Sequence, residues 1–151
     1  MVSRKQRIAV VLDTNVLVRA LKTRSRTSPN QRILRLWLLN KRLQLVVSRP
    51  LVEEYLEVFG ELLELDAELL DEWEQRFLHD ARSTVVNLGR RYQFSRDPDD
   101  NLLLATAAAG PTEYLISNDR DLLDIDPVAV NSLTFEIVSP AVFLRRIEQA
   151  R

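Results

Sequence analysis

The chain has 151 residues, of which 46% are hydrophobic and 28% charged, and its formal net charge at pH 7 is −1; this size and apolar content suit one domain, residues 1–151, with a single core. No apolar run approaches the roughly 18 residues of a membrane-spanning helix and no segment has the pattern of a signal peptide, so we expect a cytoplasmic protein. With no cysteine and one histidine, His79, the sequence excludes disulfides and thiolate sites, and any chemistry has to come mainly from carboxylates, hydroxyls, amides and arginines.

The first fifty residues predict two strands and two helices. Ile8–Leu12 is a continuous apolar run, the pattern of a strand buried on both faces. Apolar residues then recur at helical spacing over Val16–Leu21. Ser28, followed by a proline and then by a glutamine at the third helical position, resembles a capping box that opens a second helix reaching Leu38. Leu45–Val47 predicts the second strand.

The middle of the chain is mainly helical in pattern. Ser48 has the character of an N-cap for a third helix, whose apolar face runs over Leu51–Phe59. Leu62–Leu78 predicts one or two further helices, which are amphipathic and acidic. Thr84–Val86 is a short candidate strand.

The last third of the chain returns to alternation. An alanine-rich helix opens at Pro98 and ends at Gly110. Tyr114–Ile116 and Thr134–Val138 predict two more strands, and Ala141–Ile147 predicts a closing helix. Strands that alternate with helices indicate an α/β fold with a parallel sheet covered on both faces.

Acidic residues recur where the carboxyl ends of parallel strands and the N-termini of the following helices meet, along one edge of such a sheet. They are Asp13 after the first strand, Glu53 and Glu54 in the helix after the second, Asp97, Asp99 and Asp100 at the start of the alanine-rich helix, and Asp119 after the strand at 114–116. Each group has a simpler explanation by itself, because aspartates cap helices and begin turns, and glutamates face solvent. Asp13 is the hardest to explain in that way, since it interrupts an apolar strand–helix junction in a cationic half of the chain.

The conjunction of these acids suggests a metal. Two carboxylates about 4 Å apart repel each other by roughly 4 kcal/mol at an effective dielectric near 20, so four that converge need dispersal, protonation or a cation. Oxygen ligands favour Mg²⁺ or Mn²⁺ over zinc.

The sequence resembles the PIN domain, and more narrowly the PIN-family proteins that are toxin components of toxin–antitoxin systems. The motifs that carry the likeness are Val10-Val11-Leu12-Asp13-Thr14-Asn15-Val16, Ser48 through Glu54-Tyr55, Asp97-Pro98-Asp99-Asp100-Asn101 with Ala105 and Ala107, and Ser117-Asn118-Asp119-Arg120-Asp121-Leu122-Leu123. They occur in order from about residue 8 to residue 140. Each is short, but the four together are fairly specific.

The resemblance implies a three-layer α/β/α fold with a parallel sheet of about five strands, and hydrolysis of RNA with Mg²⁺ or Mn²⁺. It makes Asp13 the central metal ligand, with Asp100 and Asp119 as further ligands and Glu54 as an acidic companion. It gives supporting places to Asn15, Ser117, Asp97 and Asp121. It also implies a homodimer and a cognate antitoxin that covers the acidic edge.

Two assignments stay open. Helical periodicity does not separate Glu53 from Glu54, and the family's acid precedes a large apolar residue, as Glu54 does. The third acid is Asp97, Asp99 or Asp100; Asp100 has the family-like spacing to the following apolar residues, which leaves Asp97 as the cap.

The expected mechanism is attack on the phosphate by a metal-activated water, which needs no nucleophilic side chain. RNA would be held by basic residues, which are concentrated in the first fifty positions (twelve Lys or Arg against one acid), with Arg19 and Lys22 as first candidates. One alternative is a catalytically inactive PIN-like binding module. Another is a phosphoaspartyl hydrolase or receiver domain, which would need a late lysine, whereas all three lysines come before residue 42.

Overall fold

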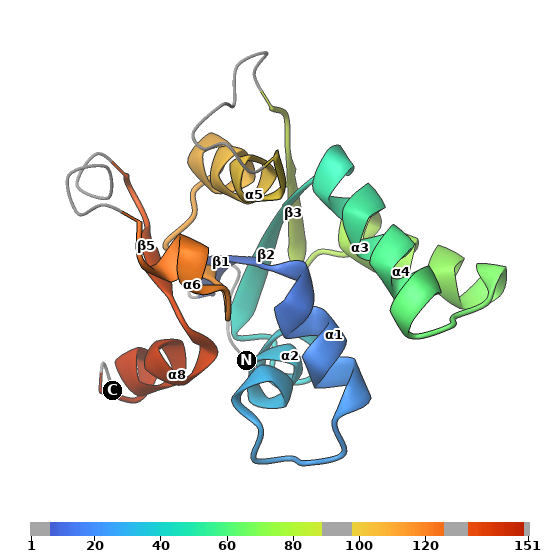
Figure 1. Cartoon of the computed structure of the whole chain (residues 1–151), viewed down its shortest axis with the longest axis horizontal. Coiled ribbons are helices and arrows are strands. Elements are labelled where there is room, and N and C mark those ends of the chain that lie inside the picture. Colours follow the sequence, from blue (N-terminus) through green and yellow to red (C-terminus); the bar gives the residue numbers. More distant parts are fainter. Residues whose placement is uncertain (1–6, 89–97, 126–132, 150–151) are drawn as a thin grey trace.

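Five parallel strands form the central sheet of the computed structural model, which describes residues 7–88, 98–125 and 133–149, and the backbone alone at 98–101. The strand order is β3-β2-β1-β4-β5 (Figure 1). The strands are β1 (Ile8–Leu12), β2 (Leu43–Ser48), β3 (Ser83–Val86), β4 (Tyr114–Ile116) and β5 (Glu136–Val138). The helices are α1 (Thr14–Lys22), α2 (Pro29–Leu38), α3 (Arg49–Leu62), α4 (Ala67–His79), α5 (Pro98–Ala109), α6 (Arg120–Leu123) and α8 (Pro140–Gln149). The predicted α/β class and parallel sheet are confirmed.

The sheet is built outward from β1, which pairs with β2 on one side and β4 on the other. Val10 lies opposite Leu45 in β2 and opposite Tyr114 in β4. Helices cover both faces of this central strand, so Val10, Val11 and Leu12 are fully buried. This is why β1 is an unbroken apolar run rather than an alternating one.

The helices form two layers around the sheet. α5 packs on β1, β2 and β4, whereas α2 and α8 pack on each other, α2 on β2 and α8 on β4. Right-handed crossovers place α5 on the face opposite α1–α4, because the chain reverses its direction across the sheet after β3. In Figure 1, α5 accordingly lies above the sheet, with α2 and α8 below it. The molecule is a three-layer α/β/α structure.

An aromatic cluster fastens α3 and α4 to the layer that contains α2. Trp37 of α2 stacks on Phe77 of α4 with ring centroids 5.7 Å apart, and Tyr55 of α3 contacts the same Phe77 ring at 5.0 Å. The indole N–H of Trp37 donates to the Arg82 carbonyl at 3.0 Å, which satisfies its polar group in the core. The second turn of α3 is thereby held against the sheet.

Two local interpretations of the sequence need correction. Ser28 is the N-cap of α2, but its side chain accepts no capping hydrogen bond. The Ser28 amide already donates to the Ser25 carbonyl, and the Gln31 amide side chain reaches the Thr23 carbonyl at 3.5 Å. The Ser28 amide and the Gln31 side chain are thus engaged elsewhere, so the predicted capping box does not form. The proline predicted at the start of α2 is in place.

Gly110 ends α5, as predicted, but for a reason of packing and not of backbone conformation. It does not adopt a positive φ. A Cβ at Gly110 would lie 2.8 Å from Val46 Cγ1 and 3.0 Å from Val86 Cγ1. The glycine is needed because the end of the helix passes so close to β2 and β3.

Element boundaries differ modestly from the sequence-based ones. The acidic region after α3 forms the single helix α4, and β5 begins at Glu136, two residues later than expected. The short helix α6 was not predicted. Within the described residues, no helix is both long and apolar enough to cross a membrane.

Candidate active site

The site is determined by the point at which the strand order reverses. The chain passes from β1 to β2 in one direction across the sheet, whereas β4 and β5 lie on the other side of β1. In open α/β sheets, ligands bind outside the carboxyl ends of the two strands that flank such a reversal. Asp13 directly follows β1, and Ser117 and Asp119 follow β4. Two of the four segments that were predicted to carry chemistry therefore meet at this reversal.

Asp13 is a buried carboxylate between β1 and α1. Its amide donates to the Ile116 carbonyl of β4 at 2.9 Å, and its carbonyl accepts the first bond of α1, from Val16. The residue is only 9% exposed. Burial is the largest influence on the Asp13 carboxyl and raises its pKa above the ordinary 3.8, against the lowering effect of a hydrogen bond from Ser117. The free-energy cost of burying this charge has to be offset by other interactions.

Ser117 joins Asp13 to Asp119. Its hydroxyl donates to Asp13 Oδ2 at 2.6 Å, and the same oxygen accepts from the Asp119 amide at 2.9 Å. The two bonds together limit the distance between the Asp119 nitrogen and the Asp13 carboxylate to about 5.5 Å. The charge of Asp119 also contributes to the raised pKa of Asp13. The two aspartates therefore lie at the same edge of the sheet, and they are close enough to repel each other.

Asp119 also has a structural role. It is the N-cap of α6, and one of its carboxylate oxygens accepts from the Asp121 amide at 2.9 Å. Its side chain is half-buried, and Asp121 is exposed. The cap fixes the direction of the Asp119 carboxylate, because Oδ1 is held against the start of the helix.

Glu54 reaches the same region from the second turn of α3. The Thr14 hydroxyl, one residue after Asp13, donates to Glu54 Oε2 at 2.8 Å. Glu54 is half-buried, whereas Glu53 is exposed. Helical periodicity did not separate these two glutamates. In the structure they differ, because Glu54 faces the junction between β1 and α1.

Tyr55 connects the backbone of β1 to α3. Its hydroxyl donates to the carbonyl of Leu12, the residue before Asp13. The phenol is fully buried, and its pKa is raised well above the ordinary 10.0 by burial and then by the charges of Asp13 and Glu54. Both carboxylates therefore act on the same buried oxygen. Tyr55 remains a neutral donor at physiological pH.

The third group of predicted acids lies at the start of α5. Asp99 and Asp100 are in the first turn of this helix by their backbone, and their side chains are not described. Asp97 lies outside the described residues. The helix is tied to the N-terminus of α3 by a buried bond between the hydroxyls of Ser48 and Thr106, 2.8 Å apart.

The oxygen-rich set at this edge has the chemistry of a site for a hard divalent cation. Asp13, Glu54 and Asp119 are carboxylates, and Ser117 and Thr14 add hydroxyls that hold two of them in place. Within the described part of the chain, no three acidic or imidazole side chains are already arranged to hold a metal ion. This statement does not include the acids at the start of α5, because their side chains are not described. The donor set fits Mg²⁺ or Mn²⁺ better than a soft metal.

The predicted polar and basic residues of α1 lie on its solvent face. Asn15, Arg19 and Lys22 are all exposed. At 1.5 Å per residue, Arg19 and Lys22 lie about 8 and 12 Å along the helix axis from its first residue. They flank the acidic edge and do not line it.

Sequence reasoning overlooked Thr14 and Tyr55. Thr14 was read only as part of a motif, although a hydroxyl next to the central aspartate is a natural donor to a second carboxylate. Tyr55 was placed on the apolar face of α3, which is correct for its ring. A buried tyrosine hydroxyl needs a polar partner, and that requirement was a usable signal.

A family model described as the PIN domain matches residues 9–121, which include β1, the acidic positions of α3 and α5, and Asp119. No curated protein matches the chain.

Proposed function

We propose, from the premise that this chain belongs to the PIN-domain family, that it is a metal-dependent ribonuclease. The PIN domain is a nuclease fold, so a nucleic acid is the substrate class. The observation that carries the proposal is the Ser117 hydroxyl, which holds Asp13 and connects it to Asp119 at the strand reversal. Choosing RNA over DNA rests on the resemblance to PIN-family toxins.

Asp13, Asp119 and Asp100 are the proposed ligands of Mg²⁺ or Mn²⁺, with Glu54 beside them. When bound, the ion lowers the pKa of a coordinated water and stabilises the charge that develops on the phosphate. Mg²⁺ keeps several waters and uses few carboxylates directly, so some of these acids act through water. Asp97, Asn15 and Asp121 are proposed to support the site.

The protein's own groups prepare the site for this chemistry. Ser117 keeps the Asp13 carboxylate turned toward β4, and Thr14 holds one oxygen of Glu54. Glu54 is proposed as the general base, because a half-buried carboxylate beside the phosphate can take the proton from the attacking water. The Tyr55 hydroxyl fixes the carbonyl immediately before Asp13, so the central ligand is held through both its side chain and its backbone.

Arg19 and Lys22 are proposed to bind the RNA backbone beside the site. Both are exposed on α1, whose first turn adjoins Asp13. Contacts of this kind do not depend on base sequence, and they weaken as salt rises because counterions are released on binding.

Cleavage of an end-labelled, unstructured RNA in the presence of Mn²⁺ tests the proposal. The wild type should cut, EDTA should stop it, and Asp13→Asn should lower the rate at least about 100-fold, equivalent to about 3 kcal/mol of transition-state stabilisation. Asp71→Asn, a matched loss of one carboxylate on the exposed side of α4, should cut normally. A wild type that binds RNA without cutting it under Mn²⁺ would favour the inactive binding module.

A role as the toxin of a toxin–antitoxin pair is a finer proposal on the same site. It supposes a cytoplasmic protein and an antitoxin that covers the acidic edge. Expression of the wild type should then arrest bacterial growth, and Asp13→Asn should not. Active cleavage in vitro without growth arrest would refute the toxin role and leave the nuclease proposal intact.

A further inference from the structure

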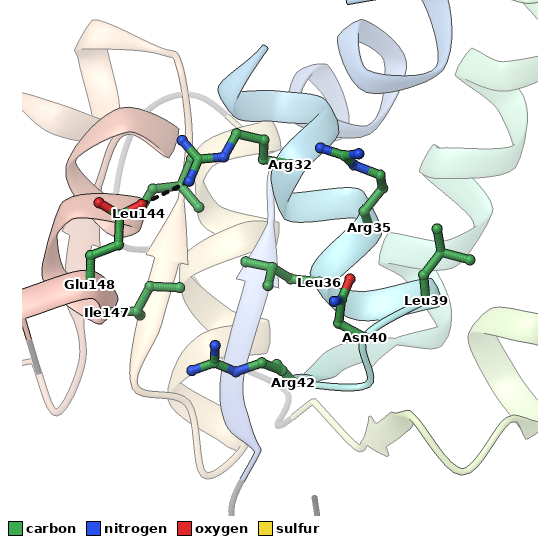
Figure 2. A pocket seen from close by; sticks show the side chains of 9 residues that line it. All are labelled: Arg32, Arg35, Leu36, Leu39, Asn40, Arg42, Leu144, Ile147 and Glu148. Carbon is green, nitrogen blue, oxygen red and sulfur yellow. Dashed lines mark hydrogen bonds and ion pairs between the residues drawn. The ribbon is translucent and has the colours of Figure 1, made fainter. Parts of the chain in front are cut away.

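A groove lies between α2 and α8, at the edge of the sheet opposite the candidate active site (Figure 2). Its volume is about 510 Å³. Arg42, at its lower end in Figure 2, directly precedes β2, so this is the amino edge of the sheet. Leu36 and Ile147 point toward each other across the gap, and Leu144 lies beside them. Arginines line its two ends, and Leu39, which is 72% exposed, lies at its margin.

The positive charge of this groove is only partly neutralised. Arg32 pairs with Glu148 of α8 at 2.7 Å, and Arg35 donates to the Arg26 carbonyl at 2.7 Å. The Arg42 guanidinium forms no ion pair with another residue of the described ranges. The groove thus combines an apolar floor with two arginines, Arg35 and Arg42, that form no ion pair between described residues. A surface of this kind suits a partner that carries both carboxylates and apolar side chains.

The chain carries one segment with that chemistry, which we term the acidic hairpin: the exposed residues of positions 57–72, where α3 turns into α4. Its exposed acids are Glu57, Glu61, Glu64, Asp66, Glu68, Asp71 and Glu72. None of them takes part in the ion pairs between described residues. Leu62 and Leu69 lie among them and are 51% and 41% exposed. Together with Leu39, they make up most of the large apolar side chains that the described surface exposes.

We propose that the groove of one copy of this chain binds the acidic hairpin of a second copy. The two surfaces are opposite in charge, and each exposes leucine beside its charged groups. The hairpin extends from the side of the molecule opposite α8 (Figure 1), so it does not reach the groove of its own chain. Because the groove and the hairpin lie on opposite sides of the molecule, two copies cannot bind each other reciprocally. The contact is therefore head-to-tail, and its repetition builds rings or chains in place of the homodimer that the resemblance to PIN-family toxins implies.

A second copy explains the groove better than a nucleic acid does. Phosphates would satisfy the arginines but would leave Leu39, which is 72% exposed, without an apolar partner. The hairpin offers carboxylates to Arg42 and leucines to the groove floor. This contact is independent of the active site, which lies at the other edge of the sheet.

Mass measurement by light scattering over a range of protein concentrations tests the contact. At 0.1 M salt the average mass of the wild type should rise above the 17.5 kDa of the monomer. At 1 M salt the screening length falls from about 10 to about 3 Å, and the association should weaken at least about tenfold. A mass of 17.5 kDa at every concentration would overturn the proposal.

Two charge-reversal variants identify the surfaces. The groove variant is Leu39→Glu with Arg42→Glu, and the hairpin variant is Glu61→Lys with Glu72→Lys. Arg42 is half-buried, and the other three positions are exposed. Each variant alone should stay monomeric, whereas Arg49→Glu, an exposed charge reversal at the first residue of α3 and so at the opposite edge of the sheet from the groove, should associate as the wild type does.

An equimolar mixture of the two variants is the decisive arm. The hairpin of the groove variant and the groove of the hairpin variant are both intact, so the mixture should give a complex of twice the 17.5 kDa monomer and nothing larger. Formation of this complex also shows that both variants are folded. No complex in the mixture, or wild-type association in either variant alone, would refute head-to-tail contact between these surfaces.

Discussion

Replacement of Asp13 by asparagine is expected to stabilise the metal-free protein while it removes activity. Burial raises the pKa of Asp13 even though Ser117 donates to its carboxylate. The folded protein therefore prefers this side chain neutral. Asparagine resembles the neutral form and accepts the same Ser117 bond through its amide oxygen. No capping bond to α1 is lost, because the Asp13 side chain makes none. The carboxylate is thus kept at a cost in stability.

The size of the effect follows from opposing contributions. A hydrogen bond to a charged group is worth about 1.5–3 kcal/mol and a neutral one about 0.5–1.5 kcal/mol, so the Ser117 bond weakens by about 1 kcal/mol. The raised pKa of Asp13 means that relief from burial and from the charge of Asp119 exceeds this loss. We therefore expect a net gain in stability, and in a domain of 151 residues each kcal/mol of gain raises Tm by about 2–4 °C.

Thermal unfolding followed by circular dichroism in EDTA, at several pH values, measures this difference. The folded pKa of Asp13 lies above its unfolded value near 3.8, so its destabilisation is fully present at neutral pH. The penalty disappears as pH falls through the folded pKa toward 3.8. The Tm advantage of Asp13→Asn should therefore be largest near pH 7 and shrink in acid. A variant less stable than the wild type at pH 7, or an advantage independent of pH, would refute this reasoning.

Three further predictions concern the same edge of the sheet. Thr14→Val, which removes the hydroxyl that holds Glu54, should lower kcat about 10–100-fold in steady-state cleavage assays. Thr112→Val is the matched control, because it makes the same chemical change at a buried hydroxyl without a partner in the described structure. It should leave kcat unchanged and add about 1 kcal/mol of stability in urea titrations. Arg19→Ala with Lys22→Ala should reduce the slope of log RNA affinity against log salt by about 0.7 per removed phosphate contact, and an unchanged slope would place the RNA elsewhere. Cleavage rate should fall as pH drops through the raised pKa of Asp13, since a protonated carboxyl cannot hold a cation; activity unchanged down to pH 4 would contradict this.

The strands and most helices could be predicted because each depends on local signals. The apolar run Ile8–Leu12 marks the central strand, and Ser48 caps α3 by accepting from the Leu51 amide, as expected. The edge that collects the acids follows from the alternation of strands and helices, because crossovers are right-handed. The positions of Asp13 and Asp119 relative to the sheet could therefore be inferred without coordinates.

The remaining details depend on strand order and on contacts between distant segments. Nothing local in the sequence shows that β4 lies beside β1, and this neighbourhood places Ser117 against Asp13. The bonds of Thr14 to Glu54 and of Tyr55 to Leu12 each join residues about forty positions apart. Periodicity places such residues on a face of a helix, but it does not identify the partner across the gap. The groove between α2 and α8 is likewise a product of packing.

Titration with Mn²⁺ tests most directly whether the carboxylates of the candidate active site converge on a cation. The free ion is followed by its electron paramagnetic resonance. The wild type should remove Mn²⁺ from solution in a stoichiometric, saturable way. Asp13→Asn should bind at least about tenfold more weakly, a loss of about 1.4 kcal/mol or more, and Asp71→Asn should match the wild type. Equal Mn²⁺ affinity in Asp13→Asn and the wild type, or no binding by either, would contradict the account.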